Sequence, residues 1–431
     1  MSSSYPSNVE DSLGLRPHDS SQGSCSIVIQ SPIPRTTVMP RLKMYPAKNG
    51  DAFLVEIAGK YILIDAGYAC TFRNEIAPDL SALHDAGKHL SLVVCTHVDA
   101  DHIGGMLEFI ASNGVSGSRQ IIEVDEVWHN SLRSLPAPPG AADSHADQRL
   151  LEAIQRRGFP ALTGSAPAAQ PISARQGSSL ARLLTQRGYR WNGGNGLQCV
   201  RSQPVSEVLP GGMELRVIGP PIERLQSLRR WWLSELRRLS YKGSGQLSDL
   251  AEDAYEMSLA SEVDPAAPSI AAVAAGSLRK LSDVYTSDTS LTNGSSIAFV
   301  AQGEGVRLLF LGDAWADDII AGLTVNETDQ LMFDVIKVSH HGSRHNSNVD
   351  LLQRVDAPCF LVSSDGSRHG HPDFEVLAEI VDRPANFRRH IYFNYDTPAA
   401  RRLAHYSSKS GAPFSVHIGH SNWIEIEGAG T

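Results

Sequence analysis

Residues 90–105 read LSLVVCTHVDADHIGG, and this stretch decides the fold. Its first six residues form a continuous apolar run of strand length, which is typical of a strand buried on both faces of a sheet. Directly after the run stand four side chains able to bind a metal within six residues, namely His97, Asp99, Asp101 and His102. Gly104, Gly105 and the helix-like MLEFIAS follow. The polar cluster therefore lies where a buried strand ends and a helix begins.

The density of this cluster predicts a metal site. Carboxylates and imidazoles this close together would repel one another or stay without partners unless a divalent cation organised them. A helix N-cap accounts for one aspartate but not for all four groups. The mixture of nitrogen and oxygen ligands suits zinc, manganese or iron.

Other polar groups follow apolar strands later in the chain. Asp313 ends LLFLGD, His340 and His341 end VIKVSHH, and His371 stands in RHGHP. A single histidine after a strand is more often a turn residue than a ligand. Because several such groups share one sheet edge with the first cluster, we expect them to contact metal or substrate.

The pattern along the chain predicts a layered α/β protein. Residues 1–38 are polar and Pro/Ser-rich and predict a disordered tail, and residues 39–431, with the insertion described below, are expected to form one folded domain. Three short strands are expected between residues 41 and 67, and further strands in SSIAFVAQ, VRLLFLGD, DVIKVS, CFLVSS, HIYFNY, FSVHIG and NWIEIE.

Residues 111–285 read as a long insertion, because Pro, Ala, Gly and Ser collect there between short helical pieces. Its clearest helix is predicted over residues 222–240, with an apolar stripe on one face. Arginines fall largely off that stripe and form either a solvated face or a polyanion-binding surface: Arg224, Arg229, Arg230, Arg237 and Arg238.

Composition limits the class of protein. The 431 residues carry a formal charge of -9, which gives no general affinity for nucleic acid or anionic membrane. The five cysteines are scattered and argue against a disulfide framework. No apolar run approaches the ~18 residues needed to cross a bilayer, and the N-terminus lacks the features of a secretory signal. We expect a cytoplasmic protein without a membrane partner.

The spaced motifs resemble the metallo-β-lactamase superfamily and, within it, the hydrolase domain of ComEC-type competence proteins and their soluble relatives. The motifs are GDAFLVE, YILIDAG, THVDADHIGG, NGSSIAF, LLFLGD, KVSHHGS and GHP, spread over about 41–110 and 287–375. The resemblance implies an αββα sandwich with a dinuclear metal site at one edge of the two sheets.

It also implies ligands. His97, Asp101 and His102 match the H-x-H-x-D-H motif, while Asp99 takes the place of its second histidine. Asp313 resembles a bridging aspartate, and Asn293 stands where a histidine usually opens the preceding strand. The implied first site is oxygen-rich and suits manganese, and consists of His97, Asp99, Asn293 and Asp313.

The implied second site is richer in imidazole and suits zinc, and consists of Asp101, His102, Asp313 and either His340 or His341. We favour His341 as the ligand and His340 as a phosphate contact or acid. His371 resembles a later motif and is either a ligand or a substrate group.

Two close cations would activate water for hydrolysis, with Asp101 orienting it and His340 assisting the leaving group. We expect a metal-dependent hydrolase that uses Zn2+ and/or Mn2+ on a phosphoester substrate, as a phosphodiesterase or as a nuclease acting on nucleic acid. One alternative is a hydrolase of another small ester or lactone. The other is a metal-poor binding or regulatory protein partner in a multicomponent bacterial defence-type system.

Overall fold

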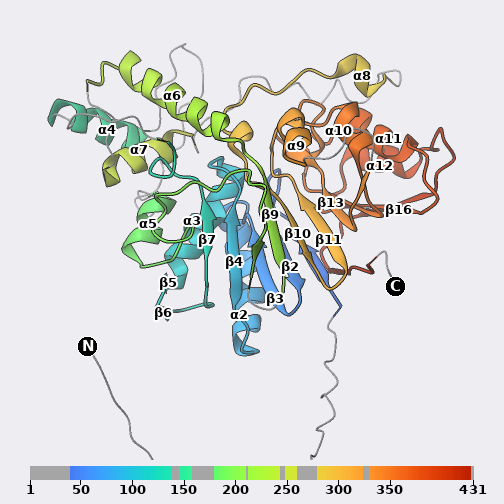
Figure 1. Cartoon of the computed structure of the whole chain (residues 1–431), viewed down its shortest axis with the longest axis horizontal. Coiled ribbons are helices and arrows are strands. Elements are labelled where there is room, and N and C mark those ends of the chain that lie inside the picture. Colours follow the sequence, from blue (N-terminus) through green and yellow to red (C-terminus); the bar gives the residue numbers. More distant parts are fainter. Residues whose placement is uncertain are drawn as a thin grey trace, which may run out of the picture. The chain divides into compact units, whose positions relative to one another are not determined.

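The computed structural model describes residues 39–136, 145–157, 179–209, 212–242, 248–259, 279–323 and 330–428 (Figure 1). The disordered tail predicted over residues 1–38 lies outside the described residues. Within the described ranges, no helix is both long enough and apolar enough to cross a bilayer.

The first sheet has six strands in the order β18-β1-β2-β3-β4-β7. They are β1 Arg41–Met44, β2 Phe53–Ile57, β3 Lys60–Ile64, β4 Leu90–Cys95, β7 Val127–His129 and β18 Trp423–Glu425. The first three pair antiparallel, as the sequence predicts, whereas β4 and β7 join in parallel. A parallel neighbour needs a crossover. Between β3 and β4 this crossover consists of α1 Ala69–Thr71, η1 Phe72–Ile76 and α2 Ala77–Asp85.

The second sheet has eight strands in the order β17-β16-β15-β13-β11-β10-β9-β8. They are β8 Glu207–Val208, β9 Glu214–Gly219, β10 Ala298–Gly303, β11 Val306–Phe310, β13 Val335–Lys337, β15 Cys359–Val362, β16 Arg389–Phe393 and β17 Phe414–Ile418. From β11 to β17 all neighbours are parallel. The carboxyl ends of β11, β13 and β15 therefore meet at one edge.

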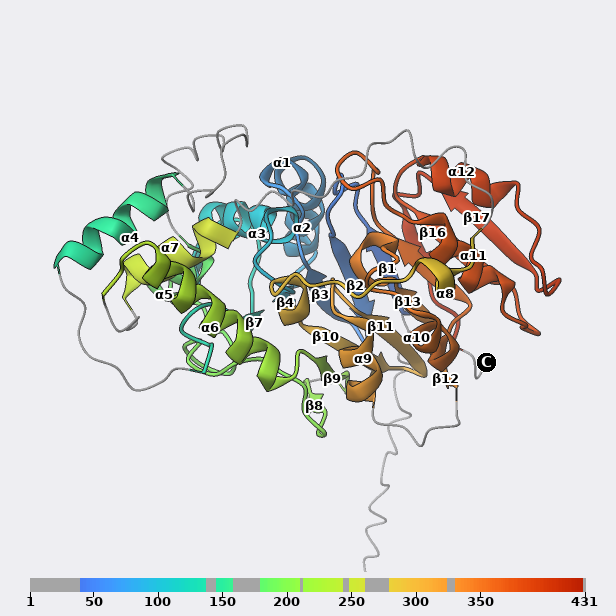
Figure 2. The same cartoon turned by 90° about the horizontal axis from the view of Figure 1, so that it is seen from above.

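The apolar core is built in layers. Between the sheets, side chains of both pack together, and the rings of Phe53 and Phe310 meet edge to face at 5.8 Å. The helix α3 Ala100–Asn113 covers the outer face of the first sheet together with α2. The outer face of the second sheet is covered by α9 Ala316–Leu323, α10 Val349–Arg354, α11 Phe374–Asp382 and α12 Pro398–Ala404 (Figure 2). This order of layers confirms the predicted αββα sandwich.

Smaller elements complete the described chain. Two short two-stranded sheets pair β5 Gly114–Val115 with β6 Ser118–Arg119 and β12 Leu331–Met332 with β14 Val355–Asp356. Short helical turns are α8 Leu281–Val284, η4 Asn293–Ser295 and η5 Ser339–Gly342.

The segment 111–285 contributes strands as well as helices. Its strands β7, β8 and β9 belong to the two large sheets. Its helices are α4 His145–Arg157, α5 Leu180–Gln186, α6 Ile222–Arg238 and α7 Asp249–Leu259. They gather beside α3, on the side away from α11 and α12 (Figure 2). The insertion boundaries stay a prediction, but the segment is built into both sheets.

Buried ion pairs hold this group of helices to the first sheet. Three acids on α7 are buried, and Glu256 lies 2.8 Å from Nε2 of His129 at the end of β7. Asp253 pairs with Arg182 at 2.7 Å, and Glu252 pairs with Arg133 at 2.5 Å. Because breaking a buried pair leaves an uncompensated charge, these contacts fix α7 firmly in place.

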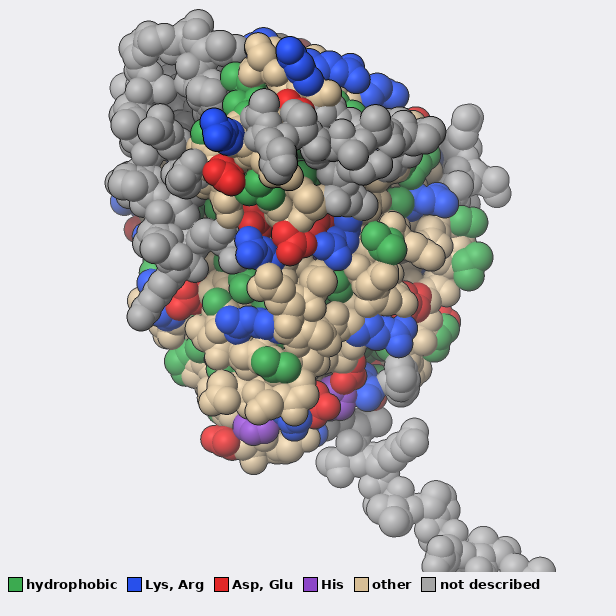
Figure 3. Space-filling model, turned by 90° about the vertical axis from the view of Figure 1, so that its left-hand side faces the viewer, with side chains coloured by type: hydrophobic (Ala, Val, Ile, Leu, Met, Phe, Trp, Pro, Cys, Tyr) green, Lys and Arg blue, Asp and Glu red, His purple; other side chains and the backbone are tan. Residues whose placement is uncertain are grey.

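Helix α6 matches the helix predicted over residues 222–240, but its arginines are only partly solvated. Arg229 is buried, and Arg224 pairs with Asp318 at 2.7 Å while stacking over the ring of Trp315. On the face of the molecule beside α4–α7, a few basic side chains lie together at the upper edge, and the others lie at separate places among acidic and apolar ones (Figure 3). Neither observation supports a continuous polyanion-binding surface on the described residues.

Candidate metal centre

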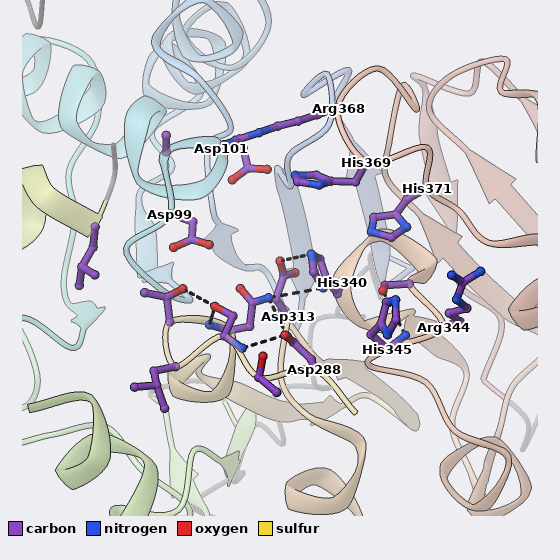
Figure 4. A pocket seen from close by; sticks show the side chains of 18 of the residues that line it. Asp99, Asp101, Asp288, Asp313, His340, Arg344, His345, Arg368, His369 and His371 are labelled. Carbon is purple, nitrogen blue, oxygen red and sulfur yellow. Dashed lines mark hydrogen bonds and ion pairs between the residues drawn. The ribbon is translucent and has the colours of Figure 1, made fainter. Parts of the chain in front are cut away.

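Loops at the carboxyl ends of four strands bring the predicted site residues to one edge of the sandwich (Figure 4). The strands are β4, β11, β13 and β15, and the residues that follow them are His97, Asp99, Asp101, His102, Asp313, His340, His341 and His371. Segments more than 200 residues apart in the chain thus meet at one site.

Two glycines allow these segments to approach closely. A β-carbon on Gly105 would lie 2.0 Å from the carbonyl oxygen of Ala66, and one on Gly50 would lie 2.0 Å from that of Asp101. Only glycine lets backbone come this near. The helix α3, which carries Asp101 and His102 in its first turn, is therefore seated against both loops.

One carboxylate oxygen forms the centre of the cluster. Oδ2 of Asp313 lies 3.7 Å from Nε2 of His97 and 3.6 Å from Nε2 of His102. It also lies 3.6 Å from Nε2 of His341 and 3.7 Å from Nε2 of His340. Two ligand atoms that share a cation at about 2.1 Å stand roughly 3 to 4 Å apart. These separations fit ligands around a cation and are too long for hydrogen bonds.

Contacts on the other ring nitrogen orient the imidazoles. Nδ1 of His341 donates to the carbonyl oxygen of Ser363 at 2.8 Å, and Nδ1 of His102 lies 2.8 Å from Oδ2 of Asp65. The contact with Ser363 points Nε2 of His341 inward, as in metal-binding histidines held by an outer partner. Nε2 of His97, His102 and His341 is buried without a hydrogen-bond partner. Such orphaned acceptors fit a metal centre.

Four overlapping groups of buried donors could hold an ion, and two of them use predicted ligands alone. One contains His97, His102 and Asp313, and the other contains Asp101, His102 and His341. The remaining two add aspartates that the sequence reasoning missed, as Asp51–Asp313–His341 and Asp51–Asp65–His102. Together the four groups contain seven buried side chains that could bind metal: Asp51, Asp65, His97, Asp101, His102, Asp313 and His341.

The other predicted site residues surround these groups. Asp99 lies 3.5 Å from Nε2 of His97, and Asn293 donates from Nδ2 to Asp288 at 2.8 Å. His340 and His371 line the cavity above, with ring centres 5.2 Å apart. Among the described residues, these four stand outside the donor groups.

The missed residues had recognisable signals. Asp51 and Asp65 stand in GDAFLVE and YILIDAG, beside the strands β2 and β3, and Lys337 interrupts the apolar strand β13. Lys337 is 1% exposed, pairs with Asp51, and lies 3.7 Å from Oδ1 of Asp313. A charge inside a buried strand needs such partners, so Lys337 predicts a buried acid nearby.

Electrostatics favour ionised carboxylates. Burial alone would raise the pKa of Asp51, but Lys337 and His341 outweigh burial and lower the pKa to about 2. Likewise His340, His341 and His102 hold the pKa of Asp313 well below its usual range despite burial. The donor groups contain Asp51, Asp65, Asp101 and Asp313, against one lysine. The excess negative charge suits divalent cations.

The two adjacent histidines adopt an unusual backbone. His340 and His341 have φ values of 44° and 55°, in the left-handed region that non-glycine residues seldom occupy. Such conformations cost of the order of 1–3 kcal/mol each and occur where function requires them. Here they turn two neighbouring imidazoles toward the same carboxylate of Asp313.

A cavity of about 640 Å³ opens above the cluster. Its walls include Asp99, Asp101, Asp313 and His340, which face one another across the opening (Figure 4). Basic and imidazole side chains come from the loops after β13 and β15, as Arg344, His345, Arg368, His369 and His371. Apolar side chains come from α6, α7 and the loop before η4, as Leu228, Trp231, Leu259 and Leu291.

One family model and several solved structures are similar to this chain. Residues 45–171 match the family model described as the metallo-beta-lactamase superfamily. No curated protein matches the chain. A solved structure of Igni18, a metallo hydrolase from Ignicoccus hospitalis, is 12% identical, with a TM-score of 0.35, and the match covers 90% of this chain and 100% of that chain.

Two further solved structures are similar. The metallo-beta-lactamase fold protein YhfI from Bacillus subtilis is 9% identical with a TM-score of 0.34, and the match covers 90% of this chain and all of that one. A metallo-beta-lactamase from Cronobacter sakazakii is 18% identical with a TM-score of 0.19, over 42% of this chain and 54% of that chain. From the match over residues 45–171 and the αββα sandwich, we conclude that this chain has the metallo-β-lactamase fold.

Proposed function

We propose that this chain is a metal-dependent phosphodiesterase with two divalent cations, of the kind expected for soluble relatives of the ComEC-type hydrolase domain. The observation that carries the proposal is the convergence of four imidazole Nε2 atoms on Oδ2 of Asp313. His97, His102, His341, Asp101 and Asp313 would hold the cations, with Asp51 and Asp99 beside them.

When bound, two cations lower the pKa of bound water toward neutrality and offset charge on a phosphoryl oxygen. Asp101 is suited to accept a proton or orient water, because Asn49 donates to its Oδ2 at 2.6 Å and fixes the carboxylate. Asn49 in turn accepts a hydrogen bond from the hydroxyl of Tyr68 at 3.0 Å.

His340 is suited to assist the leaving group. Its Nδ1 donates to Oδ1 of Asn346 at 2.7 Å, and Asn346 donates to Asp288 at 2.9 Å. This chain of contacts fixes the ring with Nε2 toward Asp313 and the cavity. In its imidazolium form, His340 would donate its Nε2 proton to the departing oxygen. His371 stays neutral, because burial lowers its pKa to about 4, and it would accept or position substrate.

The basic side chains on one wall of the cavity favour a phosphodiester over a neutral ester or lactone. Arg344 and Arg368 line it, and Nε of Arg344 is buried without a hydrogen-bond partner. Guanidinium groups bind phosphate oxygens well because their donors match the geometry. The net charge of -9 favours a small phosphodiester over a long nucleic acid, which would need a broad basic surface.

The test is hydrolysis of bis-p-nitrophenyl phosphate by metal-depleted protein before and after addition of manganese or zinc. We expect activity only with metal, and we expect Asp313→Ala to lose both the cations and the turnover. Asp396→Ala is the matched control, because its carboxylate is exposed and pairs only with Arg401 among the ion pairs of the described residues. Equal activity of the Asp313→Ala variant would exclude this metal centre as the catalyst.

A further inference from the structure

The cavity above the metal centre has two chemically different sides. Basic and imidazole groups come from the loops after β13 and β15. The opposite elements, α6 and α7, belong to the segment 111–285 and supply Leu228, Trp231 and Leu259 (Figure 2). A site for a purely polar substrate gains nothing from an apolar side, because apolar surface left in water is unfavourable.

Trp231 is the notable member of this apolar side. Its neighbour Trp232 is 1% exposed and packs edge to face on Tyr255 at 5.6 Å, so Trp232 serves the core. Trp231 is only partly buried and also lines the cavity. The helix α6 lies against η4, whose Asn293 also lines the cavity. Trp231 therefore presents an indole close to the metal-binding edge.

An indole in such a position suits a flat ring. Aromatic side chains are stacking platforms for nucleobases and bind them through their faces with little dependence on base identity. The cavity of about 640 Å³ lies within the range of small-molecule sites, which is roughly 300–1,000 Å³. Phosphate would lie at the basic side and the metals, and the ring would lie at the apolar side.

We propose that Trp231 forms an aromatic subsite and that the substrate is a small phosphodiester carrying a nucleobase or a similar planar ring. This inference rests on the proposed phosphodiesterase function, whose metal centre would bind the phosphate. The apolar side from α6 and α7 gives the segment 111–285 a direct role in substrate choice.

The experiment compares equilibrium binding of AMP and ribose 5-phosphate to the manganese-loaded full chain by calorimetry. The two ligands share the phosphate and the ribose, so their difference reports the ring. We expect AMP to bind about 5- to 150-fold more tightly. Trp231→Leu keeps an apolar helix-forming side chain without a ring and should remove most of the difference, whereas Trp231→Phe should keep much of it.

Trp423→Ala is the control, because this partly buried tryptophan stacks with Arg41 and lies outside the cavity. Circular dichroism tests whether each variant is folded. If Trp231→Leu does not fold, the preference for AMP is judged from Trp231→Phe instead. Equal binding of AMP and ribose 5-phosphate by the wild type would overturn the inference, as would a preference that survives in Trp231→Leu.

Parallel hydrolysis of bis-p-nitrophenyl phosphate separates the two proposals. Hydrolysis without a preference for AMP would refute the aromatic subsite and leave the phosphodiesterase standing. A preference for AMP that depends on Trp231, without any metal-dependent hydrolysis, would support the subsite and refute the catalytic function.

Discussion

Replacing Lys337 by methionine should destabilise the metal-free protein strongly. The ammonium is 1% exposed, pairs with Asp51, and donates to the carbonyl oxygen of Gly312 at 2.9 Å. Methionine preserves the volume but leaves the carboxylate of Asp51 buried without its main partner. Removing one member of a buried pair costs about 3–5 kcal/mol. We expect a loss of that size in the free energy of unfolding.

The pKa of Asp51 reflects the combined effect of Lys337 and the nearby histidines. A fall from 3.8 to about 2 corresponds to about 2 kcal/mol of stabilisation. Because the folded pKa is the lower one, this stabilisation is present above pH ~4 and is lost as the pH falls toward 2. It is smaller than the expected mutational loss, since burial of the unpaired carboxylate adds its own cost.

The assay is urea unfolding at pH 7 with a chelator present, and again with manganese. Lys88→Met is the matched control, because Lys88 is exposed and its replacement should change stability by less than about 0.5 kcal/mol. The double variant Lys337→Met/Asp51→Asn should recover part of the loss, because the uncompensated charge is gone. If Lys337→Met unfolds within about 1 kcal/mol of the wild type without metal, the buried pair does not stabilise the fold and the reasoning is refuted.

The remaining predictions concern catalysis and packing. His340→Ala should keep its metals, and its kcat should fall by a factor of about 10²–10⁴, as expected for a lost general acid. His341→Ala should lose metal, which elemental analysis of the purified variant would detect. Equal metal loss in both would contradict this division of roles. Gly105→Ala should lower the free energy of unfolding in urea by about 1–3 kcal/mol, because its β-carbon would meet the carbonyl oxygen of Ala66 at 2.0 Å. Gly117→Ala is the control and should leave the free energy of unfolding unchanged, because open space surrounds Gly117. Chelator titration should remove the cations in two steps, with activity lost in the first and restored better by manganese than by zinc. A single step would contradict two unlike sites.

The sheets were predictable because their strands are apolar and end in recognisable turns. Residues 90–95 form β4 with the bounds that the apolar run predicts, and the three strands of residues 41–67 were all expected. The strand β9 was not predicted, because it follows Pro- and Gly-rich stretches of the segment 111–285 that favour an insertion. Only its pairing with β10 reveals that it belongs to the second sheet.

The candidate site was predictable where ligands cluster in sequence and less so where they are single. His97, Asp101 and His102 stand within six residues, whereas Asp51 and Asp65 each stand alone between strands. A lone acid before or after a strand is common, and only its side-chain contacts in the folded chain identify it as part of the site. The contact of Asp65 with Nδ1 of His102, and that of Asp51 with Lys337, depend on segments far apart in the chain.

The arrangement of donors also changes the difference in metal preference that we expect between the two predicted sites. His102 takes part in the group with His97 and in the group with His341, so imidazole is available on both sides of Asp313. Asn293 already donates from its amide to Asp288, whereas Asp99 makes no capping hydrogen bond to α3 and lies 3.5 Å from Nε2 of His97. We therefore expect Asp99, rather than Asn293, to complete the predicted first site. With His97 and two carboxylates as its expected ligands, the first site should prefer manganese less strongly than a site made of oxygen ligands alone.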